Sequence, residues 1–139
     1  MSRSLTGLIA FVIVFHLIAF VGEAFLWMNP AIHEFLLQKL DTPIEASLYE
    51  QALILETLFV NQGFYNLFVA LGGIAGFCLR AKSYKAQGTT LLAYMCFFAV
   101  GAGLVLLATT SAYIGGVLQA APAFLALILM YKSQLFSRE

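Results

Sequence analysis

The chain has 139 residues, enough for one ordinary domain, but 62% of them are hydrophobic and only 10% are charged. This composition is far from that of soluble globular domains, so lipid is the expected solvent for most of the surface. Seven basic and seven acidic residues give a formal charge of zero, which points to no nucleic acid or other polyanionic partner.

Four segments are apolar enough to be transmembrane helices, which need about 20 mostly apolar residues each. They cover residues 5–27, 53–79, 89–109 and 112–131. Because lipid cannot satisfy open backbone groups, we expect these segments to be helices. The predicted fold is all-α, a four-helix transmembrane bundle that forms a single integral membrane domain over residues 1–139.

After the first span, Asn29 and Pro30 are typical of a helix cap followed by proline in the first turn. Apolar residues then recur at helical spacing, at Ile32, Phe35, Leu36 and Leu40. They predict a short amphipathic helix on the membrane surface between spans one and two. His33 is expected in this surface helix, without a chemical role.

A second helix start is predicted at the stretch TPIE. Thr42 can cap, Pro43 fits the first turn and Glu45 can complete a capping box. The second span would then begin near Pro43 and protrude from the bilayer before it enters the hydrocarbon core.

Charges near the predicted helix ends indicate the direction of the spans. The basic residues there are Arg3, Arg80, Lys82, Lys85, Lys132 and Arg138. The connection between spans one and two instead carries four acids and one lysine: Glu34, Asp41, Glu45, Glu50 and Lys39. The positive-inside rule then predicts cytoplasmic N- and C-termini and an acidic connection on the outer side.

Two ionisable residues stand out inside the first span, in the stretch HLIAFVGEAFLW. His16 and Glu23 are seven residues apart, which places them on one helix face about two turns from each other, with Trp27 one turn farther. Ionisable groups near the bilayer centre cost about 2.5 to 3.5 kcal/mol, so they usually face the bundle interior. In the alternative, Glu23 contacts headgroup water and His16 is an ordinary core residue.

The stretch NQGFYN in the second span offers polar partners. Its four large polar residues are expected to cover one side of the helix: Asn61, Gln62, Tyr65 and Asn66. Because the first two spans are antiparallel, the first two of these should lie near the depth of Glu23 and the other two nearer His16. Interhelical hydrogen bonding without any ligand is the alternative, at about 0.6 kcal/mol per bond.

Small residues suggest where the helices pack closely. Gly72, Gly73 and Gly76 are predicted on the same face as the amides, in a G-x-x-x-G spacing that suits contacts within the chain or in a homo-oligomer. The third span is predicted to be an apolar packing wall with a contact stripe at Ala99 and Gly103.

Gln119 is the polar residue of the fourth span that we expect in the bundle interior. It shares a helix face with Pro122, whose ring shifts the local backbone pattern. Its depth approximates that of Glu23. A third helix would thus contribute to the polar cluster.

The stretches HLIAFVGEAFLW, NQGFYNLFVA and LQAAPAFLALIL resemble the bacterial integral membrane family known as domain of unknown function 1304. The resemblance covers most of the chain and rests on His16, Glu23, Phe25, Asn61, Gln62, Gly63, Tyr65, Asn66 and Gln119. It implies a four-helix protein of the bacterial inner membrane and brings no established activity. Where relatives often have a Tyr-Gly pair late in the third helix, this chain has Leu106 and Leu107, which implies a less polar pocket on that side.

The function we expect is binding of a lipidic or other small hydrophobic ligand in a polar pocket near the outer leaflet. Apolar walls with a few convergent polar groups are typical of such sites. The predicted ligand-binding residues are His16, Glu23, Trp27, Asn61, Gln62, Tyr65, Asn66 and Gln119.

Other functions fit the same residues. Glu23 and His16 are candidate catalytic residues, as acid and base on a lipid or isoprenoid, or they could relay protons or ions. The cluster could also be structural or bind a partner subunit. No metal site is expected, because only one His and one Glu lie at the right level, and the sequence identifies no cofactor. Membrane lipids are the expected partners.

Overall fold

The computed structural model describes residues 1–40 and 44–133. Its helices are α1 (Arg3–Ala24), α2 (Pro30–Leu37), α3 (Leu48–Ala81), α4 (Lys85–Thr109) and α5 (Tyr113–Lys132). All helices but α2 are long and apolar enough to cross a membrane, and the described residues contain no strand. The predicted all-α fold with four spans and one short intervening helix is confirmed, and the chain is a multi-pass membrane protein.

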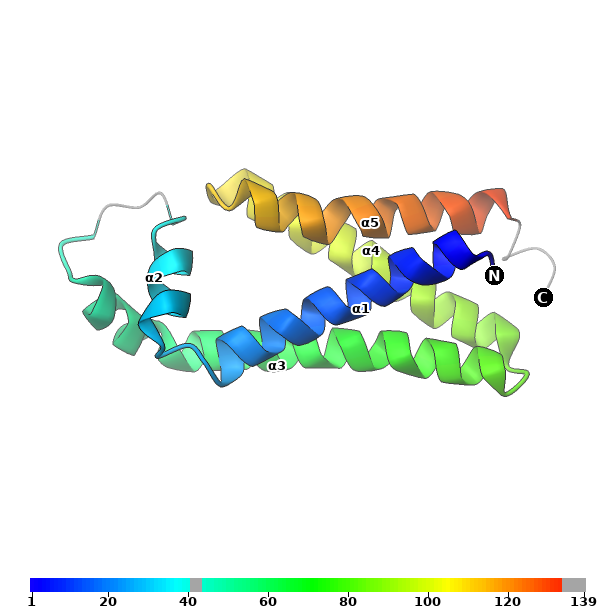
Figure 1. Ribbon diagram of the computed structural model, residues 1–139, viewed down its shortest axis with the longest axis horizontal. Helices are drawn as coiled ribbons and strands as arrows, with labels where there is room; N and C mark the ends of the chain where they lie inside the picture. The colour runs from blue at the N-terminus through cyan, green and yellow to red at the C-terminus, as the bar shows by residue number, and fades with distance from the viewer. Residues whose placement is uncertain (41–43, 134–139) are drawn as a thin grey trace.

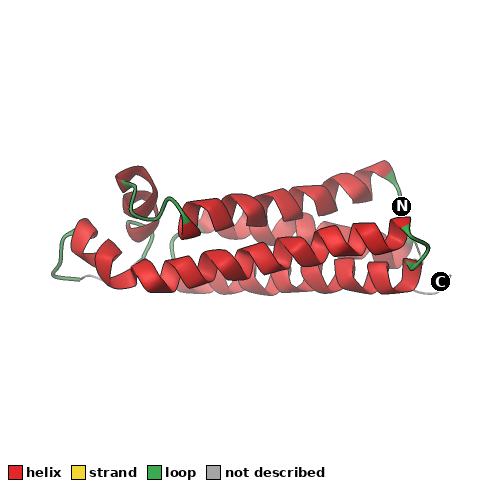
Figure 2. Cartoon of the chain, turned by 90° about the horizontal axis from the view of Figure 1, so that it is seen from below, coloured by secondary structure: helices red, strands yellow, loops and turns green. Residues whose placement is uncertain are grey.

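The four long helices form an elongated bundle, in which α1 and α4 run diagonally between α3 and α5 (Figure 1). α1 packs mainly on α3, and α4 packs on both α3 and α5. The chain start and the last turn of α5 lie at one end of the bundle, which we call the termini end, and α2 lies at the other, the α2 end. The quarter turn in Figure 2 shows the same lengthwise arrangement.

The start of the short helix follows the predicted chemistry. The Asn29 side chain accepts a hydrogen bond from the Ala31 backbone N–H at 3.0 Å, and Pro30 occupies the first turn. An asparagine cap satisfies an otherwise open backbone donor, and proline has no donor to lose at this position. The cap prediction at Asn29 is therefore confirmed.

The predicted start of the second span near Pro43 is wrong. α3 begins at Leu48, because Ser47 accepts from the Glu50 backbone N–H at 3.2 Å and the Glu50 carboxylate accepts from the Ser47 backbone N–H at 2.8 Å. This reciprocal capping box satisfies two donors at once, whereas Glu45 precedes the helix. Thr42 and Pro43 lie outside the described residues.

α3 is long enough to extend past the bilayer. Its 34 residues span about 51 Å at 1.5 Å per residue, against a hydrocarbon core of about 30 Å. Trp27, Leu37 and Ala52 form a small apolar cluster around its first turns, with Leu55 and Phe59 packed against it. The protruding part of α3 is thus covered by the connection that contains α2.

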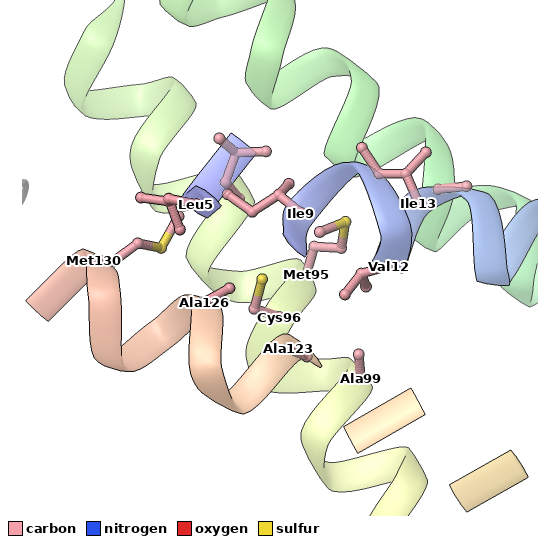
Figure 3. Close-up of a cluster of buried hydrophobic side chains, with 12 residues drawn as sticks. Leu5, Ile9, Val12, Ile13, Met95, Cys96, Ala99, Ala123, Ala126 and Met130 are labelled. Carbon is pink, nitrogen blue, oxygen red and sulfur yellow. The ribbon is translucent and has the colours of Figure 1, made fainter. Parts of the chain in front are cut away.

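The main core lies where α1, α4 and α5 meet (Figure 3). Ile9 of α1, Cys96 and Ala99 of α4, and Ala123 and Ala126 of α5 are completely buried. Small residues on α4 and α5 let these helix backbones approach closely, which replaces the hydrophobic driving force that is weak between helices in lipid.

α4 and α5 meet through glycines, as predicted for the stripe at Ala99 and Gly103. A Cβ on Gly103 would lie 2.8 Å from the Gly116 carbonyl oxygen of α5. A Cβ on Gly116 would lie 2.6 Å from the Leu107 side chain. Leu107 therefore packs on the α5 backbone at Gly116.

α3 faces its neighbours with a small-residue stripe that also contains the buried Asn66. A Cβ on Gly63 would lie 2.8 Å from the Ala24 backbone nitrogen of α1, and one on Gly73 would contact Ile13. Gly72, by contrast, has nothing within 4 Å of its Cβ position. The prediction that Gly72 shares the packing face is therefore wrong.

Gly63→Ala should destabilise the protein by about 1 to 3 kcal/mol, the usual range for overpacking a tight contact. The new methyl group would meet the α1 backbone at Ala24, which cannot rotate away as a side chain can. Unfolding in mixed micelles, followed by circular dichroism, measures the change. Gly72→Ala is the matched control on the same helix, and equal losses from both variants would contradict the close α1–α3 contact.

Candidate functional site

α1 presents its two ionisable groups on one side of the helix. The His16 side chain is completely buried and Glu23 is partly buried. Seven residues at 1.5 Å per residue separate them by about 10.5 Å along the axis. Glu23 lies in the last turn of α1, near the α2 end, and His16 lies two turns deeper in the bundle.

Glu23 meets Asn66 of α3, which we predicted nearer His16, and not Asn61 or Gln62, which we predicted at the depth of Glu23. The Asn66 side-chain amide donates to Glu23 Oε2 at 2.7 Å, and Asn66 is only 6% exposed. The carboxyl group therefore points toward the neighbouring helix and away from bulk solvent. A hydrogen bond to a carboxylate is stronger than one between neutral groups, so this contact fixes both side chains.

His16 uses one ring nitrogen and leaves the other without a partner. Nδ1 lies 2.7 Å from the Val12 carbonyl oxygen. Since a carbonyl only accepts, Nδ1 carries the proton of this bond, and in the neutral ring Nε2 is an acceptor. Nε2 is buried and has no hydrogen-bond partner among residues 1–40 and 44–133. Phe15 packs edge-on against the ring, with centroids 5.8 Å apart.

The other polar residues of α3 do not reach this site. Asn61, Gln62 and Tyr65 are exposed, although we predicted them beside Glu23 and His16. The prediction took the side of the helix richest in polar groups as the inner side. The structure instead buries Gly63 and Asn66, because Gly63 permits the α1 backbone to come close.

Gln119 of α5 is partly buried but does not join the Glu23–Asn66 contact. Its side chain makes no hydrogen bond within the described part of the chain. The buried residues of α5 are Gly116, Ala120, Ala123, Ala126 and Met130, so its inner face is centred one residue past Gln119. Gln119 was predicted to bring a third helix into the polar cluster, but α5 does not take part in the Glu23–Asn66 contact.

Trp27 does not continue the polar face of α1, because the helix ends at Ala24 and not at Trp27. The indole is 2% exposed and stacks on Phe59 with ring centroids 3.7 Å apart. Its Nε1–H donates to the Ala52 carbonyl at 2.8 Å. Trp27 therefore anchors the turn after α1 to the protruding part of α3.

His33 lies in the short helix α2, as predicted, and its side chain is buried. It is 1% exposed, and its Nδ1 lies 3.1 Å from the Trp27 carbonyl oxygen, to which it donates. His33 and Leu37, four residues apart, are the buried residues of α2, so the helical spacing could have indicated the inner side of this helix. The partner on that side could not be read from the spacing.

A contact that the sequence did not indicate joins the α4–α5 turn to the segment that follows α2. Both the backbone N–H and the hydroxyl of Ser111 donate to the Lys39 carbonyl oxygen, at 3.0 and 3.1 Å. Ser111 lies in the turn between α4 and α5, and Lys39 lies just after α2. The connection between α1 and α3 is thus fastened to the α4–α5 turn across the α2 end of the bundle.

The two ends of the bundle carry opposite charge. At the termini end lie the basic residues Arg3, Arg80, Lys82, Lys85 and Lys132, and Arg80 donates to Thr89 across the α3–α4 contact. Toward the α2 end lie Glu34, Glu45, Glu50 and Glu56, against Lys39. Asp41 and Arg138 lie outside the described residues. Glu23 therefore sits nearer the acidic end.

A groove of about 360 Å³ runs along the outward face of α1. It is lined by Val14, Leu17, Ile18, Val21, Gly22, Leu26 and Ile32. Ile18 follows His16 by two residues, about 200° around the helix, so this groove lies on the opposite side from the polar face. It is an apolar surface suited to acyl chains and is separate from Glu23.

No three metal-ligating side chains of His, Cys, Asp or Glu gather among residues 1–40 and 44–133. The chemistry that the described site offers comes from a carboxyl group, an amide and an imidazole nitrogen. These groups can bind and orient a polar head.

Comparison with known proteins gives a family match. The family described as Protein of unknown function (DUF1304) matches the chain over residues 10–131, which confirms the resemblance drawn from the sequence. No curated protein and no solved structure matches the chain. The matched range includes every candidate site residue, while the family's description names no activity.

Proposed function

Since the chain belongs to the family described as Protein of unknown function (DUF1304), we propose a function from its geometry: it binds a lipid-like amphiphile inside the membrane, with the ligand's polar head at Glu23. The observation that carries the proposal is the Glu23–Asn66 hydrogen bond of 2.7 Å. It holds a carboxyl group toward the bundle interior, on the same side of α1 as the buried His16.

A purely structural role accounts less well for the site. A polar cluster that serves only to hold helices together satisfies its buried groups internally, because each unsatisfied one costs about 1 to 3 kcal/mol. His16 Nε2 is left without a partner among the described residues. This open acceptor lies two turns deeper than Glu23 on the same helix face, and the contacts between the helices leave it unsatisfied.

Acid–base catalysis and proton relay rank below binding. His16 and Glu23 are about 10.5 Å apart along α1, whereas direct proton transfer needs heavy atoms about 2.6 to 3.2 Å apart. Turnover of a bound lipid that stops in both Glu23→Gln and His16→Ala would favour catalysis. Proton flux into liposomes that stops in the same variants would favour the relay.

The charge distribution supports a specific membrane orientation. The positive-inside rule favours the basic termini end in the cytoplasm and the acidic α2 end outside. Together with the bacterial family that the sequence resembles, this suggests the inner membrane as the location. Glu23 then lies near the outer leaflet, from which a lipid-like ligand would enter.

The test is ligand retention by wild type and Glu23→Gln. We expect wild type, purified in detergent and analysed by native mass spectrometry, to retain an amphiphile. Glu23→Gln should bind it about tenfold to a hundredfold more weakly, since a hydrogen bond to a charged group contributes about 1.5 to 3 kcal/mol. Glu56→Gln, which changes an exposed acid of α3, is the control. Equal retention by all three proteins would contradict binding at Glu23.

A further inference from the structure

We infer that the head group recognised at Glu23 is a hydrogen-bond-donating cation, as in a long-chain primary amine, and not an anionic phosphate or carboxylate. This inference rests on the proposed function, because it names the class of ligand for the same site. Three observations support it. The groups that α1 presents at the site are hydrogen-bond acceptors, no basic side chain of the described residues stands beside Glu23, and the side of Glu23 that faces α3 is closed.

The groups on the polar face of α1 are acceptors. Glu23 accepts the hydrogen bond from Asn66. His16 has committed its Nδ1 proton to the Val12 carbonyl, so its open nitrogen offers a lone pair. A ligand head that meets the Glu23 carboxylate therefore binds best when it donates hydrogen bonds. An anionic head would meet a carboxylate of the same sign of charge, which is repulsive.

No basic side chain of the described residues stands beside Glu23 to hold an anion. Arg3, Arg80 and Lys132 belong to the termini end of the bundle (Figure 1). Lys39 is the described basic residue at the α2 end, and its ammonium group lies over the Phe35 ring, 5.7 Å from the centroid. Burying an anion without a cation is strongly unfavourable in a membrane.

The direction of access also favours a cation. The α3 side of Glu23 is closed, because Gly63 packs directly on the α1 backbone at Phe20 and Ala24. A ligand head must therefore approach Glu23 from another side. Glu34, Glu45, Glu50 and Glu56 surround the α2 end, and clustered charge of one sign raises the local concentration of the opposite ion.

The experiment compares four amphiphiles that share a dodecyl chain and differ in the head group. Dodecylamine is a donating cation, dodecyltrimethylammonium is a cation without a donor, dodecanol is a neutral donor and dodecyl phosphate is an anion. The protein is placed in phosphatidylcholine nanodiscs. Trp27, the only tryptophan, lies four residues after Glu23 and reports binding by fluorescence, with native mass spectrometry as a second measurement.

We expect dodecylamine to bind at least about tenfold more tightly than dodecanol or dodecyl phosphate, because a charge-assisted hydrogen bond is roughly twice as strong as a neutral one. Dodecyltrimethylammonium should fall between them. Glu23→Gln should reduce dodecylamine binding to the level of dodecanol. The difference between wild type and this variant, measured in the same bilayer, removes the contribution of membrane partitioning.

The outcomes separate the inference from the proposed function. If dodecanol or dodecyl phosphate binds as tightly as dodecylamine, and Glu23→Gln weakens that binding, the site binds amphiphiles but does not select a donating cation. If Glu23→Gln keeps its native circular dichroism and changes the binding of none of the four probes, both proposals are overturned. Glu56→Gln should behave as wild type in every arm, and a selective loss there would assign recognition to the acidic surface instead of Glu23.

Discussion

Trp27→Ala should destabilise the protein by about 3 to 5 kcal/mol, the usual range for truncating a large buried aromatic residue. The indole is buried and stacked on Phe59, and it donates to the Ala52 carbonyl. The variant would lose these side-chain contacts and the ring contact with His33, while the backbone carbonyl of residue 27 that accepts from His33 would remain. Unfolding in mixed micelles, followed by circular dichroism, measures the loss without the tryptophan signal.

Trp27→Phe separates packing from hydrogen bonding. Phenylalanine can keep the stack on Phe59 but has no N–H for the Ala52 carbonyl. The expected loss is about 1 to 3 kcal/mol, the cost of an unsatisfied buried group. A loss below about 1 kcal/mol in Trp27→Ala would contradict the role of this residue as the anchor between the α1–α2 turn and α3.

Asn66→Leu should destabilise the protein by about 2 to 3 kcal/mol, since it leaves the Glu23 carboxyl group without its donor while the apolar surroundings remain. Leucine has the same branching pattern of heavy atoms as asparagine, so the change mainly replaces the hydrogen-bonding groups by methyl groups. Mixed-micelle unfolding again provides the measurement. Asn61→Leu is the matched control, because Asn61 is an exposed amide on the same helix and its loss should stay within about 0.5 kcal/mol.

The double variant Glu23→Leu with Asn66→Leu tests whether the two residues act as a pair. Removing both partners of a buried hydrogen bond can be nearly neutral, so the double variant should recover most of the stability lost in Asn66→Leu. A double-mutant cycle gives the interaction energy directly. Additive losses would show that Asn66 contributes through packing and not through its bond to Glu23.

The spans could be predicted well because the underlying energy is local. A helix crosses lipid when its own side chains are apolar, whatever its neighbours are, so composition alone indicated α1, α3, α4 and α5. The Asn29 cap was also a local feature, since the donor and acceptor are two residues apart. The start of α3 was missed because two capping patterns stand close together, at Glu45 and at Ser47, and only the second forms the box in the structure.

The site was predicted only in part because helix rotation is a property of whole interfaces. Counting residues along two antiparallel helices placed Asn61 and Gln62 at the depth of Glu23 and Asn66 nearer His16, whereas the structure pairs Asn66 with Glu23. Which amide meets it depends on how α3 is turned about its axis. Close contacts at Gly63 and Gly73 set that rotation, bringing Asn66 to Glu23 and turning Asn61 outward.

By itself, the sequence determined that the protein lies in a membrane, how many times it spans the bilayer, and which helix carries its buried acid. Only the tertiary structure decided the partner of Glu23, the open nitrogen of His16 and the anchoring of Trp27 on α3. The physical reason is the separation along the chain over which each energy acts. The free energy of transferring a helix into lipid is a sum over the residues of that one segment. These contacts instead join residues that only packing between helices brings close together.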